Sequence, residues 1–257
     1  MNNMLEVANV EKIYPGKVAT RALHAIRFTV QQGQFVGIMG PSGSGKTTLL
    51  NLVSTIDKPS SGTVIINGQD PQRMNKNELA RFRRQQLGFV FQDFNLMDTL
   101  TVEENIVLPL TLDHVKLDEM DKRLAKAAAR LGIEDILSKR VYEISGGQRQ
   151  RTAIARAIIA QPSLILADEP TGSLDSRSSR QVMESLASIN RVDATTVLLV
   201  THDPLAASYC DRILFIKDGE LAGEIQRGES RQAFFQQIID TLSSWGGQTD
   251  ELSSIRL

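Results

Sequence analysis

The residues from Gly40 to Thr47 have the types and spacing of a loop that wraps around phosphate groups. Their sequence, GPSGSGKT, matches the pattern G-x-x-x-x-G-K-S/T at every fixed position. The glycines allow a tight turn that points backbone N–H groups inward, the lysine reaches the outer phosphates, and the threonine hydroxyl can hold Mg²⁺. An ordinary glycine-rich turn would need none of these fixed residues. We therefore predict a nucleoside triphosphate site formed by Gly40, Pro41, Ser42, Gly43, Ser44, Gly45, Lys46, Thr47 and Thr48.

A pair of carboxylates follows a short apolar run at residues 164–167. Asp168 is the expected Mg²⁺ ligand, directly or through a water, because the rigid end of a buried strand can present one carboxylate beside the phosphates. Glu169 is next in the chain and points elsewhere, where it could polarise an attacking water. The alternative for this pair is a solvated turn.

Two more polar side chains lie at the ends of apolar runs. His202 follows residues 196–200, and we expect it to contact the γ-phosphate, although a lone histidine is usually structural. Gln92 follows residues 87–91, where its amide could contact Mg²⁺ or the attacking water. The predicted catalytic residues are thus Glu169, His202 and Gln92, and the predicted metal ligands are Thr47, Gln92 and Asp168.

A second glycine-bearing helix start lies at residues 144–148. A serine cap followed by two glycines leaves backbone N–H groups open to an anion. Because the first loop already meets the needs of one nucleotide, a second anion site is redundant within one subunit. It makes sense if it closes on the nucleotide of another copy. The residues in question are Ser145, Gly146, Gly147 and Gln148.

Apolar patterns predict the elements that must position these residues. Two segments of alternating character, 5–14 and 23–30, indicate antiparallel strands before the loop. Downstream, buried strands alternate with helices, which predicts an α/β fold with a mostly parallel sheet. Residues 93–160 form a predicted helical insertion. In such sheets ligands bind at the carboxyl ends of strands, which is where the candidate residues fall.

Local signals refine this prediction. Asn67 and Gly68 form a strong hairpin-turn signal, and Thr101 begins a capping box that should start a helix. Pro109 is expected to end or kink that helix. A hairpin at 212–224 and a helix at 232–242 precede a polar tail.

Composition limits the classes of function. The chain has 257 residues, a formal net charge of −1 and one cysteine, which fits a reducing compartment and gives no reason to expect a nucleic-acid partner. No signal peptide and no run of eighteen apolar residues is visible, so a role at a membrane would require a partner.

The motifs together resemble the ATP-binding subunits of ABC transporters. Residues 40–47 resemble the Walker A loop, 144–148 the LSGGQ signature with Ile144 in place of leucine, and 164–169 the Walker B strand with its catalytic glutamate. Gln92, Asp175 and His202 match the Q-loop, D-loop and H-switch. The resemblance covers about residues 4–225, which we expect to form the ATP-binding domain, with the helical subdomain at about 93–160 and a C-terminal helix and tail at 226–257.

The resemblance implies roles that the residues alone do not give. Tyr14 matches the aromatic that stacks on adenine, whereas its spacing alone fits a half-buried strand tyrosine equally well. ATP and Mg²⁺ are the implied cofactors. Two subunits would sandwich two ATP molecules between one copy's Walker A loop and the other copy's signature. Closure and reopening would drive a membrane permease from the cytoplasmic face of the cell membrane.

A narrower resemblance points to the branch that serves FtsX-like permeases. Residues 82–84, 87–96 and 100–105 are similar to that branch, and residues 54–57, 201–210 and the tail around 234–235 resemble Bce-type antimicrobial-peptide detoxification ATPases. Such ATPases pair with a large permease and often with a sensor histidine kinase. The alternatives are an ATPase for lipoprotein release or macrolide efflux, and a soluble ABC ATPase that acts on DNA or ribosomes.

Overall fold

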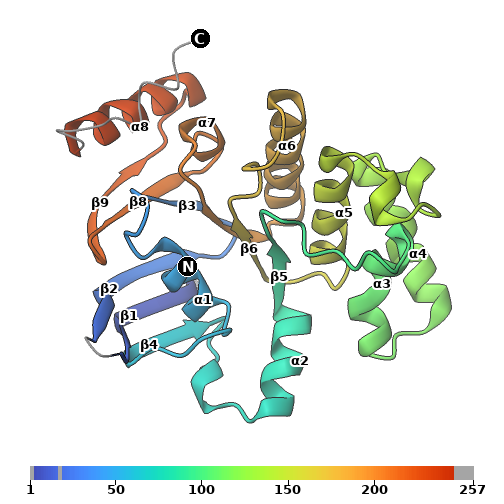
Figure 1. Ribbon diagram of the computed structural model, residues 1–257, viewed down its shortest axis with the longest axis horizontal. Helices are drawn as coiled ribbons and strands as arrows, with labels where there is room; N and C mark the ends of the chain where they lie inside the picture. The colour runs from blue at the N-terminus through green and yellow to red at the C-terminus, as the bar shows by residue number, and fades with distance from the viewer. Residues whose placement is uncertain (1–2, 17–18, 246–257) are drawn as a thin grey trace.

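The computed structural model describes residues 3–16 and 19–245, and Figure 1 shows how their elements are arranged. The part of the predicted polar tail at 246–257 lies outside the described residues. The fold is α/β, as predicted, with a small antiparallel sheet, a larger mostly parallel sheet and a group of helices at one side.

The parallel strands of the larger sheet are short and mostly apolar. Its order is β5-β6-β7-β3-β8-β9, and only β9 runs antiparallel to its neighbour. Parallel strands buried on both faces need such apolar runs, since neither face meets water. The bounds are β3 (Phe35–Met39), β5 (Leu87–Val90), β6 (Leu164–Asp168), β7 (Thr196–Val200), β8 (Arg212–Lys217) and β9 (Glu220–Gln226).

The two faces of this sheet pack into two separate cores. On β6, Leu164 and Leu166 face the core shared with the antiparallel sheet and α1, while Ile165 and Ala167 face the helices on the other side. This alternation follows from the two-residue period of a strand. The antiparallel sheet contains β1 (Asn3–Tyr14), β2 (Thr20–Gln31) and β4 (Ser61–Ile66), in the order β2-β1-β4, and α1 (Lys46–Val53) lies beneath it.

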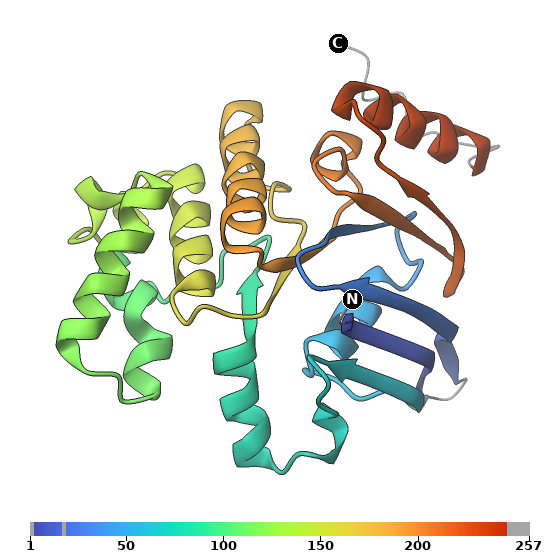
Figure 2. The same cartoon turned by 180° about the vertical axis from the view of Figure 1, so that it is seen from behind.

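The segment between β5 and β6 is helical, as predicted. Ser145 caps the third of its long helices, and Gly132 ends the second in a left-handed conformation with a φ of 60°. These helices gather on the side of the molecule away from α1, which is visible from both directions (Figures 1 and 2). The bounds are α3 (Val102–Leu112), α4 (Leu117–Leu131) and α5 (Gly146–Ile158), with short 3-10 turns at Glu134–Ile136 and Val141–Glu143.

Two local predictions need correction. Pro109 does not end the helix that starts after Thr101, which continues to Leu112, because Ile106 and Leu110 on either side of the proline are buried in the core. That burial outweighs the one backbone hydrogen bond that proline removes. Asn67 and Gly68 do form a tight turn, but across that turn Ile66 pairs with Gln69 alone, in an isolated bridge, and no second strand of a hairpin follows. A short 3-10 turn, Pro71–Arg73, comes next instead.

The last helix of the described chain packs on the core on the helical face of the larger sheet. Here α8 (Arg231–Trp245) packs on α7 (Pro204–Ala207) and buries Phe234 and Ile238. The remaining long helix, α6 (Ser176–Asp193), lies beside α5. Within residues 3–16 and 19–245, no helix combines the length and apolar character needed to cross a membrane.

The helix α2 (Lys76–Gln86) links the segment after α1 to the end of α3. Arg83 donates to the side chain and carbonyl of Thr55, at 2.8 and 2.6 Å, and Arg84 donates to Asp113 at 2.6 Å. Burial alone would raise the pKa of Asp113, but hydrogen bonds from Arg84 and Gln85 outweigh that effect and lower it. The ionised form of Asp113 therefore stabilises the folded protein.

This ion pair predicts a pH-dependent change in stability. Because the folded-state pKa of Asp113 lies below its ordinary value of 3.8, its contribution is present above that pH and is lost as the pH falls below it. We expect Asp113→Asn to lower the free energy of unfolding by about 1 kcal/mol at neutral pH and by less near pH 3. Urea unfolding at both pH values measures this difference. Asp121→Asn, on the exposed face of α4, is the matched control, and an equal loss at both pH values would contradict the prediction.

Candidate nucleotide site

The register of the parallel sheet brings the predicted site residues to one edge. Ile38 of β3 lies opposite Val200 of β7, and Val200 lies opposite Asp168 of β6. On the other side of β6, Ala167 lies opposite Val90 of β5. Because these strands are parallel, the segments that follow them leave the sheet at the same edge. Those segments carry the glycine-rich loop, Gln92, Glu169 and His202.

The glycine-rich loop packs too closely for side chains at two positions. A Cβ on Gly40 would lie 2.0 Å from the carbonyl oxygen of Ile216. A Cβ on Gly45, which has a φ of 103°, would lie 2.7 Å from the carbonyl oxygen of Ala22. The backbone N–H of Gly219 donates to the carbonyl of Ser44 at 3.1 Å, so the β8–β9 turn supports the loop from behind. The loop is therefore a fixed cradle.

The cradle has features that fit a phosphate group. The loop leads into the N-terminus of α1, where backbone N–H groups and the helix dipole favour an anion. The hydroxyl of Ser44 is buried and has no hydrogen-bond partner among the described residues. Lys46 donates through Nζ to the carbonyls of Gly40 and Pro41, at 2.8 and 2.9 Å, which holds its ammonium over the loop. These groups supply the donors that phosphate oxygens require.

The acidic end of β6 has the chemistry of a magnesium site. Burial raises the pKa of Asp168, the neighbouring Glu169 raises it further, and Lys46 partly opposes both. Among the described residues, no group of three or more His, Cys, Asp or Glu side chains is arranged so that it could hold a metal ion by itself. Mg²⁺ commonly binds one or two carboxylates together with substrate phosphates, so the oxygens of Asp168, Thr47 and Gln92 form a donor set that fits this cation.

Glu169 and His202 meet directly. The His202 ring lies with Nδ1 2.9 Å from Glu169 Oε1, and the His202 backbone N–H lies 3.4 Å from Oε2. Glu169 has a φ of 45°, a left-handed conformation that is uncommon for a residue other than glycine, and its N–H donates to the carbonyl of Val200. The turn thus presents the carboxylate at the sheet edge, with the imidazole exposed beside it.

Gln92 lies beside the turn that follows Glu169. Its side chain lies against Gly172, where a Cβ would come within 3.1 Å of Gln92 Cδ. The buried Gln150 of α5 joins the two segments, because its Nε2 donates to the carbonyls of Phe91, at 3.2 Å, and Pro170, at 2.7 Å. Our sequence analysis did not single out Gln150, and its burial inside a helix left no pattern that would have done so.

A second residue of α5 that the sequence did not identify holds the segment after Gln92. Arg156 donates to the carbonyls of Phe94, at 2.9 Å, and Asn95, at 2.5 Å, both of which have left-handed backbones. Burial lowers the pKa of Arg156, and no carboxylate lies within ion-pair distance of it in the described ranges. The arginine in SGGQRQRTAIAR is visible in the sequence, but its carbonyl partners are sixty residues away.

Tyr14 is the last residue of β1. It pairs with Thr20 of β2, two residues before Ala22, whose carbonyl contacts Gly45. The residue is 38% exposed, so part of it is open to a ligand. Its hydroxyl donates to Asp57, a residue that the sequence analysis did not include in the site.

The second glycine-bearing helix start is separate from the phosphate cradle. α5 lies across β5 and β6 from α1 in both views (Figures 1 and 2). Ser145 and Gln148 satisfy each other in a capping box, and Gly147 packs on Ser178, where a Cβ would lie 2.6 Å from the hydroxyl. Asp175 caps α6 beside it, and hydrogen bonds from Ser178 lower the pKa of Asp175.

The fold and these motifs agree with three comparisons. The sequence profile described as "ABC transporter" matches residues 23–172. The chain is 60% identical to the ABC transporter ATP-binding protein YxdL of Bacillus subtilis over the whole of both chains. It is 48% identical to the bacitracin export ATP-binding protein BceA of Halalkalibacterium halodurans, over 95% of this chain and 97% of that one.

A solved structure gives the same result. The dimeric, post-hydrolysis structure of the ATP-binding cassette MJ0796, bound to ADP and Pi, is 40% identical and covers 88% of this chain and 100% of that one, with a TM-score of 0.81. With the phosphate cradle and the fold already in place, these similarities establish that the chain belongs to the ATP-binding proteins of ABC transporters and is an ABC transporter ATPase.

Proposed function

We propose that this ATPase powers the removal or export of antimicrobial peptides of the bacitracin or lantibiotic type, together with an FtsX-like permease. The observation that carries the proposal is the 48% identity to a bacitracin export ATP-binding protein along nearly the full length of both chains. The similarity of residues 54–57 and 201–210 to Bce-type ATPases supports it. The protein would then sit at the cytoplasmic face of the membrane through its permease, and a sensor histidine kinase would join through that permease.

The geometry supports a division of roles for ATP hydrolysis. Residues 40–48 hold the phosphates, and Tyr14 stacks on adenine. Asp168, Thr47 and Gln92 would hold Mg²⁺, which would neutralise phosphate charge. Glu169 accepts a proton from the attacking water, since its carboxylate is fixed at the sheet edge. His202 orients that carboxylate through Nδ1 and uses its other nitrogen, Nε2, for the γ-phosphate.

A second copy of the chain completes the site in this proposal. α5, whose first turn carries the signature residues 145–148, lies away from α1 of the same chain, and the N-terminus of α5 suits a γ-phosphate. The dimeric form of the related cassette supports an arrangement in which each signature closes on the partner's nucleotide. Positioning and charge stabilisation then provide catalysis.

Replacing Glu169 separates binding from hydrolysis. We expect Glu169→Gln to bind ATP normally, to lower turnover at least about a hundredfold and to accumulate an ATP-bound dimer, because the amide cannot accept the proton. Phosphate release and size-exclusion chromatography with ATP measure these effects. Glu184→Gln, on the exposed face of α6, is the control. Turnover near that of the unmodified protein would rule out the assignment.

Asp168 should show a trade-off between stability and activity. Because burial and Glu169 raise its folded-state pKa, the ionised form costs folding free energy at every pH above the ordinary value of 3.8. We expect Asp168→Asn to raise the melting temperature of the nucleotide-free protein by about 2 °C and to lose Mg²⁺-dependent hydrolysis. Thermal unfolding and an ATPase assay with varied Mg²⁺ test both. A lower melting temperature would show that the ionised carboxylate does not destabilise the folded protein.

The membrane protein that accompanies this ATPase distinguishes between the candidate transport systems. We would isolate the protein from detergent-solubilised native membranes and identify what accompanies it. A large ten-helix permease with an extracellular domain is the expected result, and deletion of the gene should then sensitise the cell to bacitracin or lantibiotic-like peptides. A four-helix permease would instead favour lipoprotein release or macrolide efflux. Isolation without any membrane protein, together with tight DNA or RNA binding, would favour a soluble ABC ATPase.

A further inference from the structure

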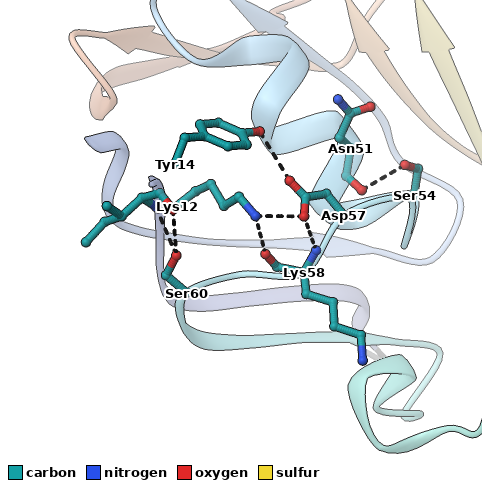
Figure 3. A network of polar contacts seen from close by, with 8 residues as sticks. Lys12, Tyr14, Asn51, Ser54, Asp57, Lys58 and Ser60 are labelled. Carbon is teal, nitrogen blue, oxygen red and sulfur yellow. Dashed lines mark hydrogen bonds and ion pairs between the residues drawn. The ribbon is translucent and has the colours of Figure 1, made fainter. Parts of the chain in front are cut away.

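The contacts around Tyr14 form a network that the proposed catalytic roles do not use. Figure 3 shows the Tyr14 hydroxyl pointing at Asp57, to which it donates at 3.2 Å. Lys12 lies over the same ring, with its Nζ 4.9 Å from the ring centroid, and donates to Asp57 at 2.7 Å. One carboxylate thus contacts both the tyrosine and the cation that covers it.

Asp57 is itself firmly anchored. Its carboxylate accepts the backbone N–H of Lys58 at 2.7 Å, and its own backbone N–H donates to the carbonyl of Asn51 in α1. Lys12 also donates to the carbonyl of Lys58 at 2.8 Å, and only 12% of its side chain is exposed. Burial would raise the pKa of Asp57, but hydrogen bonds from Lys12 and Lys58 outweigh it and lower the pKa. The carboxylate is therefore ionised and held in place.

The network is connected to the phosphate cradle through β2. Lys12 lies opposite Leu23 in the strand pairing, and a Cβ on Gly45 would lie 2.8 Å from the side chain of Leu23. Asp57 follows α1, whose N-terminus forms the end of the cradle. The ring of Tyr14 is thus fixed relative to both ends of α1, and the ammonium of Lys12 occupies one of its faces. A base could stack on the opposite face.

We propose that Asp57, together with Lys12, is a positioning residue that fixes the ring of Tyr14 for stacking on the adenine base. This inference rests on the role of Tyr14 given under the proposed function. A ring that is already oriented loses less conformational freedom when the base arrives, which strengthens binding of the nucleotide without any direct contact from Asp57. The carboxylate also keeps Lys12 at one face, so the base can approach only the other.

The test compares a ligand that has a base with one that has none. Calorimetry with the full chain would measure the affinity for the non-hydrolysable ATP analogue AMP-PNP and for inorganic tripolyphosphate. Tyr14→Phe keeps the ring and removes only its hydroxyl, while Asp57→Ala removes the acceptor. Lys58→Ala is the matched control, since its exposed side chain points away from the network (Figure 3). Tyr14→Ala reports on stacking itself.

We expect Tyr14→Phe and Asp57→Ala each to weaken AMP-PNP binding about threefold, and Tyr14→Ala to weaken it about tenfold. The double variant of Tyr14→Phe with Asp57→Ala should bind no more weakly than Asp57→Ala alone, because Asp57→Ala already removes the contact that Tyr14→Phe removes. Tripolyphosphate affinity should stay unchanged in all of them, as should both affinities in Lys58→Ala.

Three other outcomes would overturn the inference in different ways. If only Tyr14→Ala weakens AMP-PNP binding, the ring stacks without help from Asp57, and the role of Tyr14 stands. If Tyr14→Ala binds AMP-PNP normally, the stacking role fails and the inference fails with it. If tripolyphosphate affinity falls as much as AMP-PNP affinity, Asp57 supports the phosphate loop and not the base. Because Tyr14→Phe alters one exposed hydroxyl, a result from it does not depend on whether Asp57→Ala folds.

Discussion

The hydrogen-bonded register of four parallel strands is the constraint on which the rest of the structure depends. It places the ends of β3, β5, β6 and β7 at one edge, so residues separated by more than a hundred positions meet within one site. A shift of one residue in any pair would turn Asp168 or its neighbours to the wrong face, because successive side chains alternate. The continuous apolar runs bury both faces of the sheet and keep this register fixed.

The helix α5 connects the segments at that edge of the sheet to the other helices of the helical side. Its first turn carries the signature residues, its middle carries Gln150, and its last turn carries Arg156. This single helix therefore contacts the segment of Gln92 and the turn after Glu169, and its first turn forms part of the surface proposed to meet a second copy. A displacement of the Gln92 segment has to move α5 or break charge-assisted hydrogen bonds to two carbonyls. This arrangement gives a physical route between partner contacts and the nucleotide.

Much of the architecture was predictable because periodicity and capping signals are local. The strand before Gly40, the capping boxes at Thr101 and Ser145 and the stop at Gly132 all come from short-range chemistry. Pro109 did not end its helix because tertiary burial overrode a local rule, and the hairpin expected at Asn67 did not form because a turn signal says nothing about whether a second strand follows. Gln150, Arg156 and Asp57 were missed since their partners lie 20 to 62 residues away in the sequence. The roles assigned to the site residues stay predictions that the variants above will decide.

The strand order also determines when during synthesis the cradle can form. β3 is made early, but its two neighbours in the sheet, β7 and β8, belong to the last quarter of the chain. The strand that carries the phosphate loop must therefore wait, unpaired and strongly apolar, until about 180 further residues have left the ribosome. Such long-range pairing slows folding, and the exposed strand offers a surface for aggregation or for chaperones until β7 and β8 close around it. A nascent chain that stops before residue 212 would lack one of the two partners that hold the nucleotide loop in place.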